Sequence, residues 1–130
     1  MSRISVQLYS VRDQFAADPL VTLQRLAGIG FTDVEPYGLV EHVDALRDGL
    51  PRTPLSAPTA HVSLVGADLD AVFAAAVAVG VGVVIEPAVR APHWQDAAGV
   101  AATAAALNEA AKAAAGHGLR VGYHNHWWEL

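Results

Sequence analysis

The 130-residue chain contains no cysteine, which excludes disulfide bonds and thiolate metal sites and leaves His, Asp and Glu as the strong metal ligands. Basic residues are also scarce, because eight Lys and Arg stand against 13 Asp and Glu, for a formal net charge of -5 and a pI of about 5.5. Neutralising phosphate groups needs clustered Lys and Arg, so this balance argues against a broad nucleic-acid or anionic-membrane surface. A small metabolite, including an anionic one, is compatible with it.

Long apolar runs are missing as well. The segment after Met1 alternates polar and apolar side chains without the apolar core of a signal peptide, so we expect a cytoplasmic protein. The most apolar stretch, residues 71–85, is shorter than the ~20 residues of a membrane-spanning helix and is interrupted by Gly80 and Gly82. We interpret it as a helix, a turn and a buried strand. With 53% hydrophobic and 16% charged residues, the composition is that of one globular domain over residues 1–130.

Three Gly-X-Gly segments divide the chain at similar intervals. Each follows a stretch with helical spacing and precedes an apolar stretch: Gly28-Ile29-Gly30, Gly80-Val81-Gly82 and Gly116-His117-Gly118. Glycine suits the left-handed backbone position that ends a helix, and a buried strand is expected directly after it. We therefore predict about five parallel strands, beginning near Ile4, Phe31, Leu55, Val83 and Leu119, and four helices, over 18–27, 43–50, 68–79 and 95–115. This spacing matches the ~30 residues per unit of an eight-stranded β/α barrel.

Alternation within the predicted strands favours a barrel over an open sheet. In residues 4–9, apolar Ile, Val and Leu alternate with Ser, Gln and Tyr, and residues 119–126 alternate in a similar way. A parallel strand covered by helices on both sides should be apolar on both faces, whereas a barrel strand can turn polar side chains inward at the mouth. The fold class predicted is therefore α/β, as a partial (β/α)8 TIM barrel.

Each predicted strand also places a polar or ionisable side chain near its carboxyl end, where barrels of this kind have their active sites. These residues are Gln7, Tyr9, Glu35, His61, Glu86, His124 and His126. Carboxylates and imidazoles without thiols suit a divalent metal such as Mn, Mg, Co or Zn. The simpler alternatives are that Glu86 caps a helix or forms a salt bridge and that His61 is a hydrogen-bonded core imidazole. Trp127 and Trp128 could stack on a sugar, serve as buried anchors or form an exposed patch.

The most specific motif is Gly122-Tyr123-His124-Asn125-His126 followed by Glu129, and three earlier segments accompany it: residues 6–13, 30–35 and 56–64. Together they resemble the sugar phosphate isomerases/epimerases of the xylose isomerase-like TIM-barrel superfamily. The resemblance extends over nearly all of this chain but only about half of a typical ~250-residue barrel. We therefore expect a single domain of that type, truncated after strand five.

The resemblance implies a divalent metal held at the ends of strands five to eight and a pair of carboxylates that move a proton next to a sugar carbonyl. His124 stands where many relatives have Glu as the first metal ligand. The roles implied are catalytic for Glu35, His61 and Glu86, substrate-binding for Gln7, Tyr9, His126 and Trp127, and metal-binding for His124. The expected ligand is a small sugar or sugar phosphate. With strands six to eight absent, at most one of these metal ligands would remain, which is too few for a tight site, and we expect the chain alone to be inactive.

Other interpretations stay open at this point. One is a non-catalytic half-barrel that associates with itself, because strands one and five of a truncated barrel would have open edges and favour a homodimer. Another is a flavodoxin-like binding module, although residues 9–13 lack the glycine-rich phosphate loop expected after its first strand. DNA-repair endonucleases of the same superfamily are disfavoured by the acidic charge.

Overall fold

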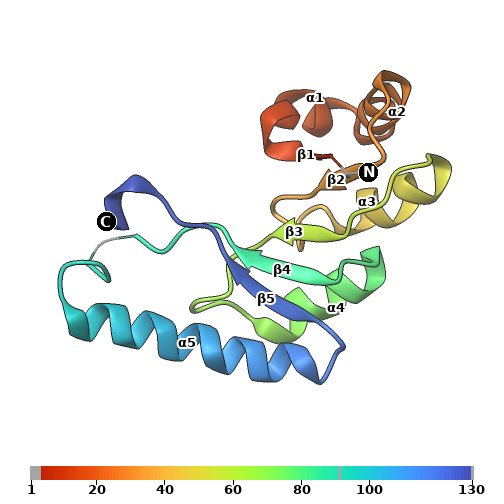
Figure 1. Ribbon diagram of the computed structural model, residues 1–130. Coiled ribbons are helices and arrows are strands. Elements are labelled where there is room, and N and C mark those ends of the chain that lie inside the picture. Colours follow the sequence, from red (N-terminus) through yellow and green to blue (C-terminus); the bar gives the residue numbers. More distant parts are fainter. Residues whose placement is uncertain (1–3, 91, 130) are drawn as a thin grey trace.

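In the computed structural model, which describes residues 4–90 and 92–129, five parallel strands alternate with helices along the chain (Figure 1). The strands are β1 (Ser5–Gln7), β2 (Asp33–Glu35), β3 (Thr59–His61), β4 (Val83–Glu86) and β5 (Arg120–Tyr123). The α-helices are α1 (Arg12–Ala17), α2 (Pro19–Ile29), α3 (Val43–Gly49), α4 (Leu69–Val79) and α5 (Ala97–Ala115). Three 3-10 turns complete the path: η1 (Leu8–Val11), η2 (Leu50–Arg52) and η3 (Trp127–Glu129). None of these helices is both long and apolar enough to cross a membrane.

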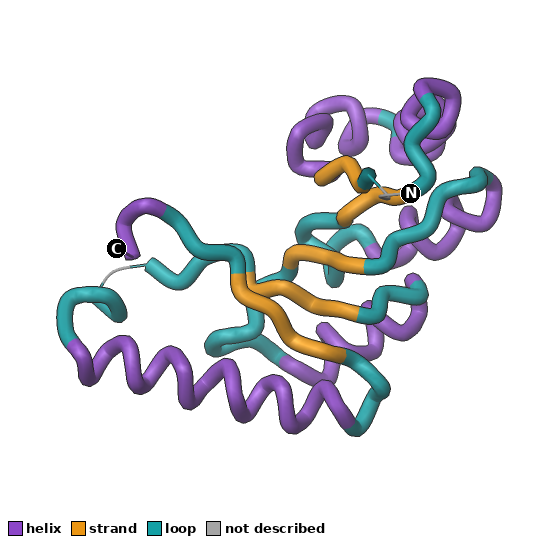
Figure 2. Tube along the Cα trace, in the orientation of Figure 1, coloured by secondary structure: helices purple, strands orange, loops and turns teal. Residues whose placement is uncertain are grey.

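The strands lie next to one another in the order in which they occur in the sequence. β1 pairs with β2, and β3, β4 and β5 form a second ladder. The two ladders are joined where Val34 N donates to Ser56 O at 2.9 Å and His61 N donates to Pro36 O at 2.7 Å. Figure 2 shows this row of strands with the helices around its outer side. A flavodoxin-like sheet would place β1 between β2 and β3, so the observed order excludes that alternative and is the order of a barrel.

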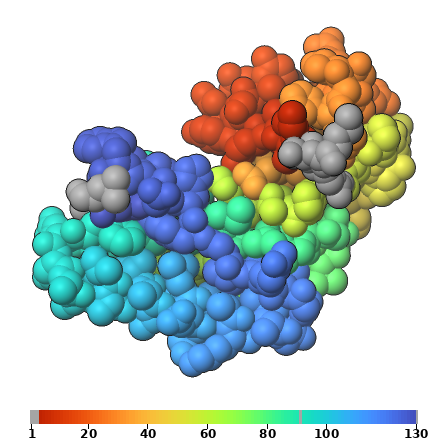
Figure 3. Space-filling model, in the orientation of Figure 1, coloured from red at the N-terminus to blue at the C-terminus, as the bar shows by residue number. Residues whose placement is uncertain are grey.

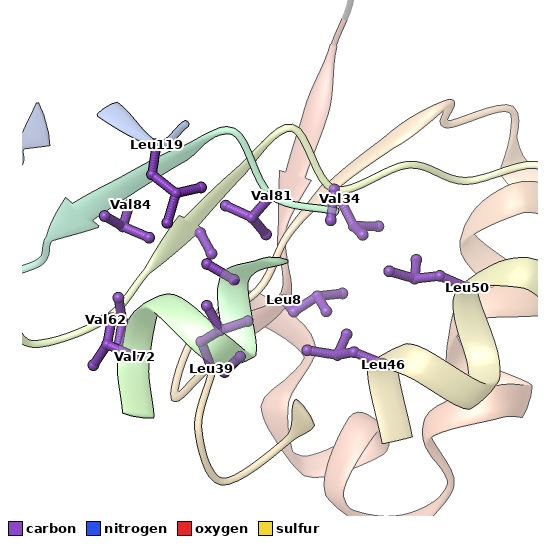
Figure 4. Packing of buried hydrophobic residues seen from close by; sticks show 14 of the residues in the cluster. Leu8, Val34, Leu39, Leu46, Leu50, Val62, Val72, Val81, Val84 and Leu119 are labelled. Carbon is purple, nitrogen blue, oxygen red and sulfur yellow. The ribbon is translucent and has the colours of Figure 1, made fainter. Parts of the chain in front are cut away.

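Alternate residues of each strand face the helices and form the core. Val34, Ala60 and Val84 are fully buried on this side, and Figure 4 shows Leu8 between Val34 and Leu46, which comes from α3. The side chains between them face the opposite, inner side of the row. The polar-inward alternation predicted for the strands is therefore present in β1, β2 and β3, where it directs Gln7, Glu35 and His61 away from the core.

The predicted helix boundaries have clear capping chemistry. Asp18 accepts a hydrogen bond from Val21 N at 3.0 Å, and Asp68 accepts one from Ala71 N at 3.2 Å, so each carboxylate caps the start of its helix. Gly30 and Gly80 end α2 and α4 in the left-handed conformation, with φ of 109° and 83°. Both helices end where the Gly-X-Gly pattern predicts.

Two expectations about the elements are wrong. Helix α1 lies in a stretch for which no helix is predicted, because only Phe15 of its six residues is buried and so short a helix has no recognisable apolar period. The third strand begins at Thr59 rather than near Leu55. Pro54 and Pro58 interrupt the backbone N–H pattern there, and Ser56 makes only an isolated bridge to Asp33.

Candidate functional site

The carboxyl ends of β1, β2 and β3 bring Gln7, Glu35 and His61 into one hydrogen-bonded network. Gln7 Nε2 lies 2.8 Å from His61 Nδ1, and His61 Nε2 lies 3.2 Å from Glu35 Oε1. Gln7 Nε2 is also 3.5 Å from Glu35 Oε1, and Thr59 Oγ1 donates to Glu35 Oε2. These residues are neighbours because Gln7 is in register with Glu35 and all of them face the inner side of the strands.

The hydrogen bonds fix the protonation state of His61. Tyr9 N can only donate, and it donates to Gln7 Oε1 at 2.9 Å, so the amide nitrogen of Gln7 must face the imidazole. His61 Nδ1 is therefore the acceptor, and its Nε2–H points to Glu35. Burial lowers the pKa of His61, Glu35 opposes that effect, and the nearby rings of His124 and His126 lower the pKa further. We conclude that His61 is neutral at pH 7.

The end of β5 continues this site with a row of stacked rings. The centroid of His124 lies 5.0 Å from that of His61, and His124 stacks on His126 at 4.7 Å with the ring planes 7° apart. His126 in turn stacks on Trp128 at 4.0 Å, and the guanidinium carbon of Arg90 lies 5.1 Å from a Trp128 ring centroid. Within the described ranges no hydrogen bond to the His124 side chain is found, so its ring nitrogens remain available to a ligand.

These groups open onto a cavity of about 680 Å³, which is within the usual range for small-molecule sites. Five of the residues singled out in the sequence line it: Gln7, Tyr9, His61, His124 and His126. Figure 3 shows the surface hollowed between the N-terminal region, in red, and the C-terminal segment, in blue. Sequence reasoning did not single out the other lining residues, among them polar side chains from loops and helix starts: Tyr37, Glu41, Asp68 and Arg90.

Glu35, Glu86 and Trp127 do not line this cavity. Glu35 lies behind Gln7 and His61, and the side chain of Trp127 is 82% exposed. Glu86 is 2% exposed, and its Oε2 accepts hydrogen bonds from Leu64 N at 2.7 Å and Val65 N at 2.9 Å.

The position of Glu86 in its strand explains this placement. It shares a face of β4 with Val84, which is fully buried toward the helices, so its carboxylate points away from the cavity. Its second oxygen, Oε1, accepts from Ala88 N at 3.3 Å. The geometry therefore favours a structural role, in which Glu86 holds the loops after β3 and β4, over the predicted catalytic one.

Glu129 holds the segment with His124 and His126 in place through hydrogen bonds. Its carboxylate accepts hydrogen bonds from the Tyr123 hydroxyl and from His126 N, the latter at 2.7 Å. Burial and the hydrogen bond to Glu129 raise the pKa of Tyr123 to about 12. The same hydroxyl accepts from Val89 N at 3.4 Å, which ties the β4–α5 loop to β5. Glu129 belongs to the sequence motif, but its role in orienting His126 appears only in three dimensions.

The described residues offer only one of the metal ligands expected from the sequence. No group of three or more His, Asp or Glu side chains in the described part of the chain is arranged to hold an ion. The in-plane lone pairs of stacked imidazoles lie in parallel planes, so His124 and His126 cannot both point at one ion in this arrangement. His124 by itself is a single candidate ligand.

The strand order, the helices outside it and the cavity at the strand ends together define part of a (β/α)8 barrel. Comparison with solved structures agrees: the chain is similar to the crystal structure of a sugar phosphate isomerase/epimerase from Parabacteroides distasonis, with a TM-score of 0.76 and 21% identity. That match covers 95% of this chain and 51% of the solved one, so the chain spans about half the length of its structural relative. At 21% identity, this similarity establishes the fold and does not by itself establish a function. No family profile and no curated protein sequence matches the chain.

Proposed function

We propose that this chain forms the strand-one-to-five half of a sugar isomerase or epimerase site. The observation that carries the proposal is the convergence of Gln7, His61 and His124 from β1, β3 and the end of β5 on one cavity. The resemblance of the sequence motifs and the shared fold with a solved protein described as a sugar phosphate isomerase/epimerase support it.

Isomerisation and epimerisation both move a proton on the carbon next to a carbonyl group. Glu35 accepts three hydrogen bonds, and both nitrogens of His61 are engaged, so neither presents a free basic atom. In our proposal these two residues are positioning residues that keep the cavity floor rigid. His124 is the basic side chain that takes up the proton, and His126, stacked on it, helps to fix its plane.

The walls of the cavity are suited to the part of a sugar that does not react. Tyr9 and Tyr37 lie on one side with their ring centroids 5.3 Å apart and their planes nearly perpendicular. Aromatic rings pack well against the C–H faces of sugars. Trp127 is too exposed to take the stacking role predicted for it in this arrangement. If the reaction uses a metal ion, that ion would need further ligands besides His124.

The binding part of the proposal can be tested with D-fructose as a probe. We expect D-fructose to shift the NMR signals of the Gln7 side-chain amide and of the His61 and His124 rings. The His61→Ala variant should bind at least ~10-fold more weakly, because it removes the group that orients Gln7. The matched control is His117→Ala, which removes an exposed imidazole outside the cavity and should bind like the wild type. Shifts confined to residues outside the cavity would contradict the proposal.

We expect the chain alone to show no measurable turnover, because it supplies only the half-site just described. The assay is solvent deuterium incorporation into D-fructose in D₂O, with and without Mn²⁺. Metal-stimulated incorporation that disappears in His124→Ala would show instead that the half-site is sufficient.

A self-associating half-barrel remains the second candidate, and open strand edges favour it. Among the described residues, β1 pairs only with β2 and β5 only with β4. Arg120 N and His124 N donate toward β4, so the alternation of a parallel strand turns Val121 N–H to the open edge.

We expect sedimentation velocity to show concentration-dependent dimers at micromolar concentration. The Val121→Pro variant, which removes that outward N–H, should weaken the dimers at least ~10-fold. A wild-type chain that stays monomeric over this range would argue against the association.

A further inference from the structure

Among the described residues that line the cavity, carboxylates outnumber Lys and Arg side chains. Glu41 and Asp68 both line it, and Glu35 lies directly behind the lining. Arg90 is the one Lys or Arg among the described lining residues. A ligand that enters this cavity therefore meets two carboxylates and a single guanidinium.

The groups that usually hold a phosphate are occupied here by other contacts. The start of α4 borders the cavity, but the Asp68 carboxylate already accepts from Ala71 N at 3.2 Å, so an anion there would have to displace it. Arg90 is held over the ring of Trp128 at 5.1 Å. His61 is neutral because its Nδ1 must accept from Gln7, so it adds no positive charge.

The same surroundings suit the hydroxyl groups of an uncharged sugar. A carboxylate accepts hydrogen bonds from hydroxyl groups without repulsion, and such charge-assisted hydrogen bonds are stronger than neutral ones. Ser10 and Ser63 add hydroxyls to the lining, and Tyr9 and Tyr37 supply ring surface. We infer that the cavity selects a small sugar or polyol without a phosphate group and disfavours the phosphorylated form of the same sugar. This inference rests on the proposed function and narrows its substrate class.

The test compares D-fructose with D-fructose 6-phosphate, each titrated into the full chain and followed through the NMR signals of His61, His124 and Tyr37. At low ionic strength we expect the phosphorylated sugar to bind at least ~10-fold more weakly, because its charge is repelled by the carboxylates. Adding salt should reduce this difference, since screening acts on the repulsion and not on the hydroxyl contacts.

Charge-removing variants locate the cause of the selectivity. The double variant Glu41→Gln with Asp68→Asn should bring the two sugars to within about threefold of each other, and Asn still caps the start of α4. The matched control, Asp44→Asn with Asp48→Asn, removes the same charge from exposed positions on α3, outside the cavity, and should keep the tenfold preference.

The outcomes separate this inference from the proposed function. Equal or tighter binding of D-fructose 6-phosphate at the cavity would overturn the inference and leave the proposed function standing. The same tenfold preference in both double variants would also overturn it, because the selectivity would not come from Glu41 and Asp68. Failure of both sugars to shift any cavity signal would overturn the inference and the proposed function together.

Discussion

Replacing Glu86 with alanine is expected to lower the free energy of unfolding by about 3 kcal/mol or more, the largest loss that we predict for any single polar side chain here. The carboxylate is 2% exposed and accepts hydrogen bonds from Leu64 N, Val65 N and Ala88 N. Its removal leaves three buried or part-buried N–H groups without their acceptor and opens a small cavity beside them. Urea denaturation followed by circular dichroism measures the loss.

Two further variants make the result interpretable. Glu86→Gln keeps one acceptor oxygen but turns an NH₂ group toward an amide N–H, so an intermediate loss is expected. Glu109→Ala removes an exposed carboxylate of α5 and should change stability by no more than about 0.5 kcal/mol. Hydrogen exchange at Leu64 and Val65 should be faster in Glu86→Ala. A variant within 1 kcal/mol of the wild type, as an order-of-magnitude limit, would mean that water or local rearrangement replaces the carboxylate.

Glu86 also shows how far the sequence determines the site. The motif spacing predicts that β4 ends in a glutamate, and the structure agrees. The direction of its side chain is harder to predict, because Val83, Val84 and Ile85 are all apolar and give no sign of which face is inward. In β1 the polar and apolar residues alternate, so the inward direction of Gln7 could be inferred from the sequence alone.

The fold is predictable where local chemistry repeats. Glycine at the helix ends and aspartate at Asp18 and Asp68 mark the junctions of the β/α units, and the structure confirms the partial barrel that they imply. Tyr37 and Arg90 lie in loops, where no periodic pattern indicates that they line the cavity. Their place depends on how the loops fold over the strand ends, which composition and spacing do not reveal.

The network around His61 makes stability depend on pH in a definite direction. The pKa of His61 is lowered in the folded chain, so the unfolded chain binds more protons as the pH falls below the ordinary histidine value of 6.5. The contribution of neutral His61 to the free energy of unfolding is therefore complete above pH 6.5, and it is lost as the pH falls through the lower pKa of His61 in the folded chain. A proton on His61 Nδ1 would face the amide N–H of Gln7, so two donors would point at each other. The Gln7 amide cannot turn around to avoid this without losing the hydrogen bond from Tyr9 N to Gln7 Oε1.

The Gln7→Glu variant should reverse this dependence. One oxygen of the new carboxylate can keep the bond from Tyr9 N, and the other faces His61 Nδ1 and accepts its proton. The imidazolium then lies between two carboxylates, Glu35 and the new one, so we expect the pKa of His61 to rise above its ordinary value. A raised pKa stabilises the fold below the pKa of the unfolded chain, and that contribution is lost as the pH rises through the folded-state pKa. The expected change in unfolding free energy across the transition is about 1 kcal/mol or more.

NMR titration of the His61 ring from pH 5 to 8, together with urea unfolding at both ends of that range, tests this reversal against an internal control. The ring signals of the exposed His117 should be the same in the wild type and in the variant at each pH, because His117 lies outside the network. If His61 in Gln7→Glu still titrates below the ordinary histidine pKa, the tautomer assigned here is wrong. The Gln7 nitrogen would then not be the group that keeps His61 neutral, and the case for a rigid, uncharged floor beneath His124 would fail with it.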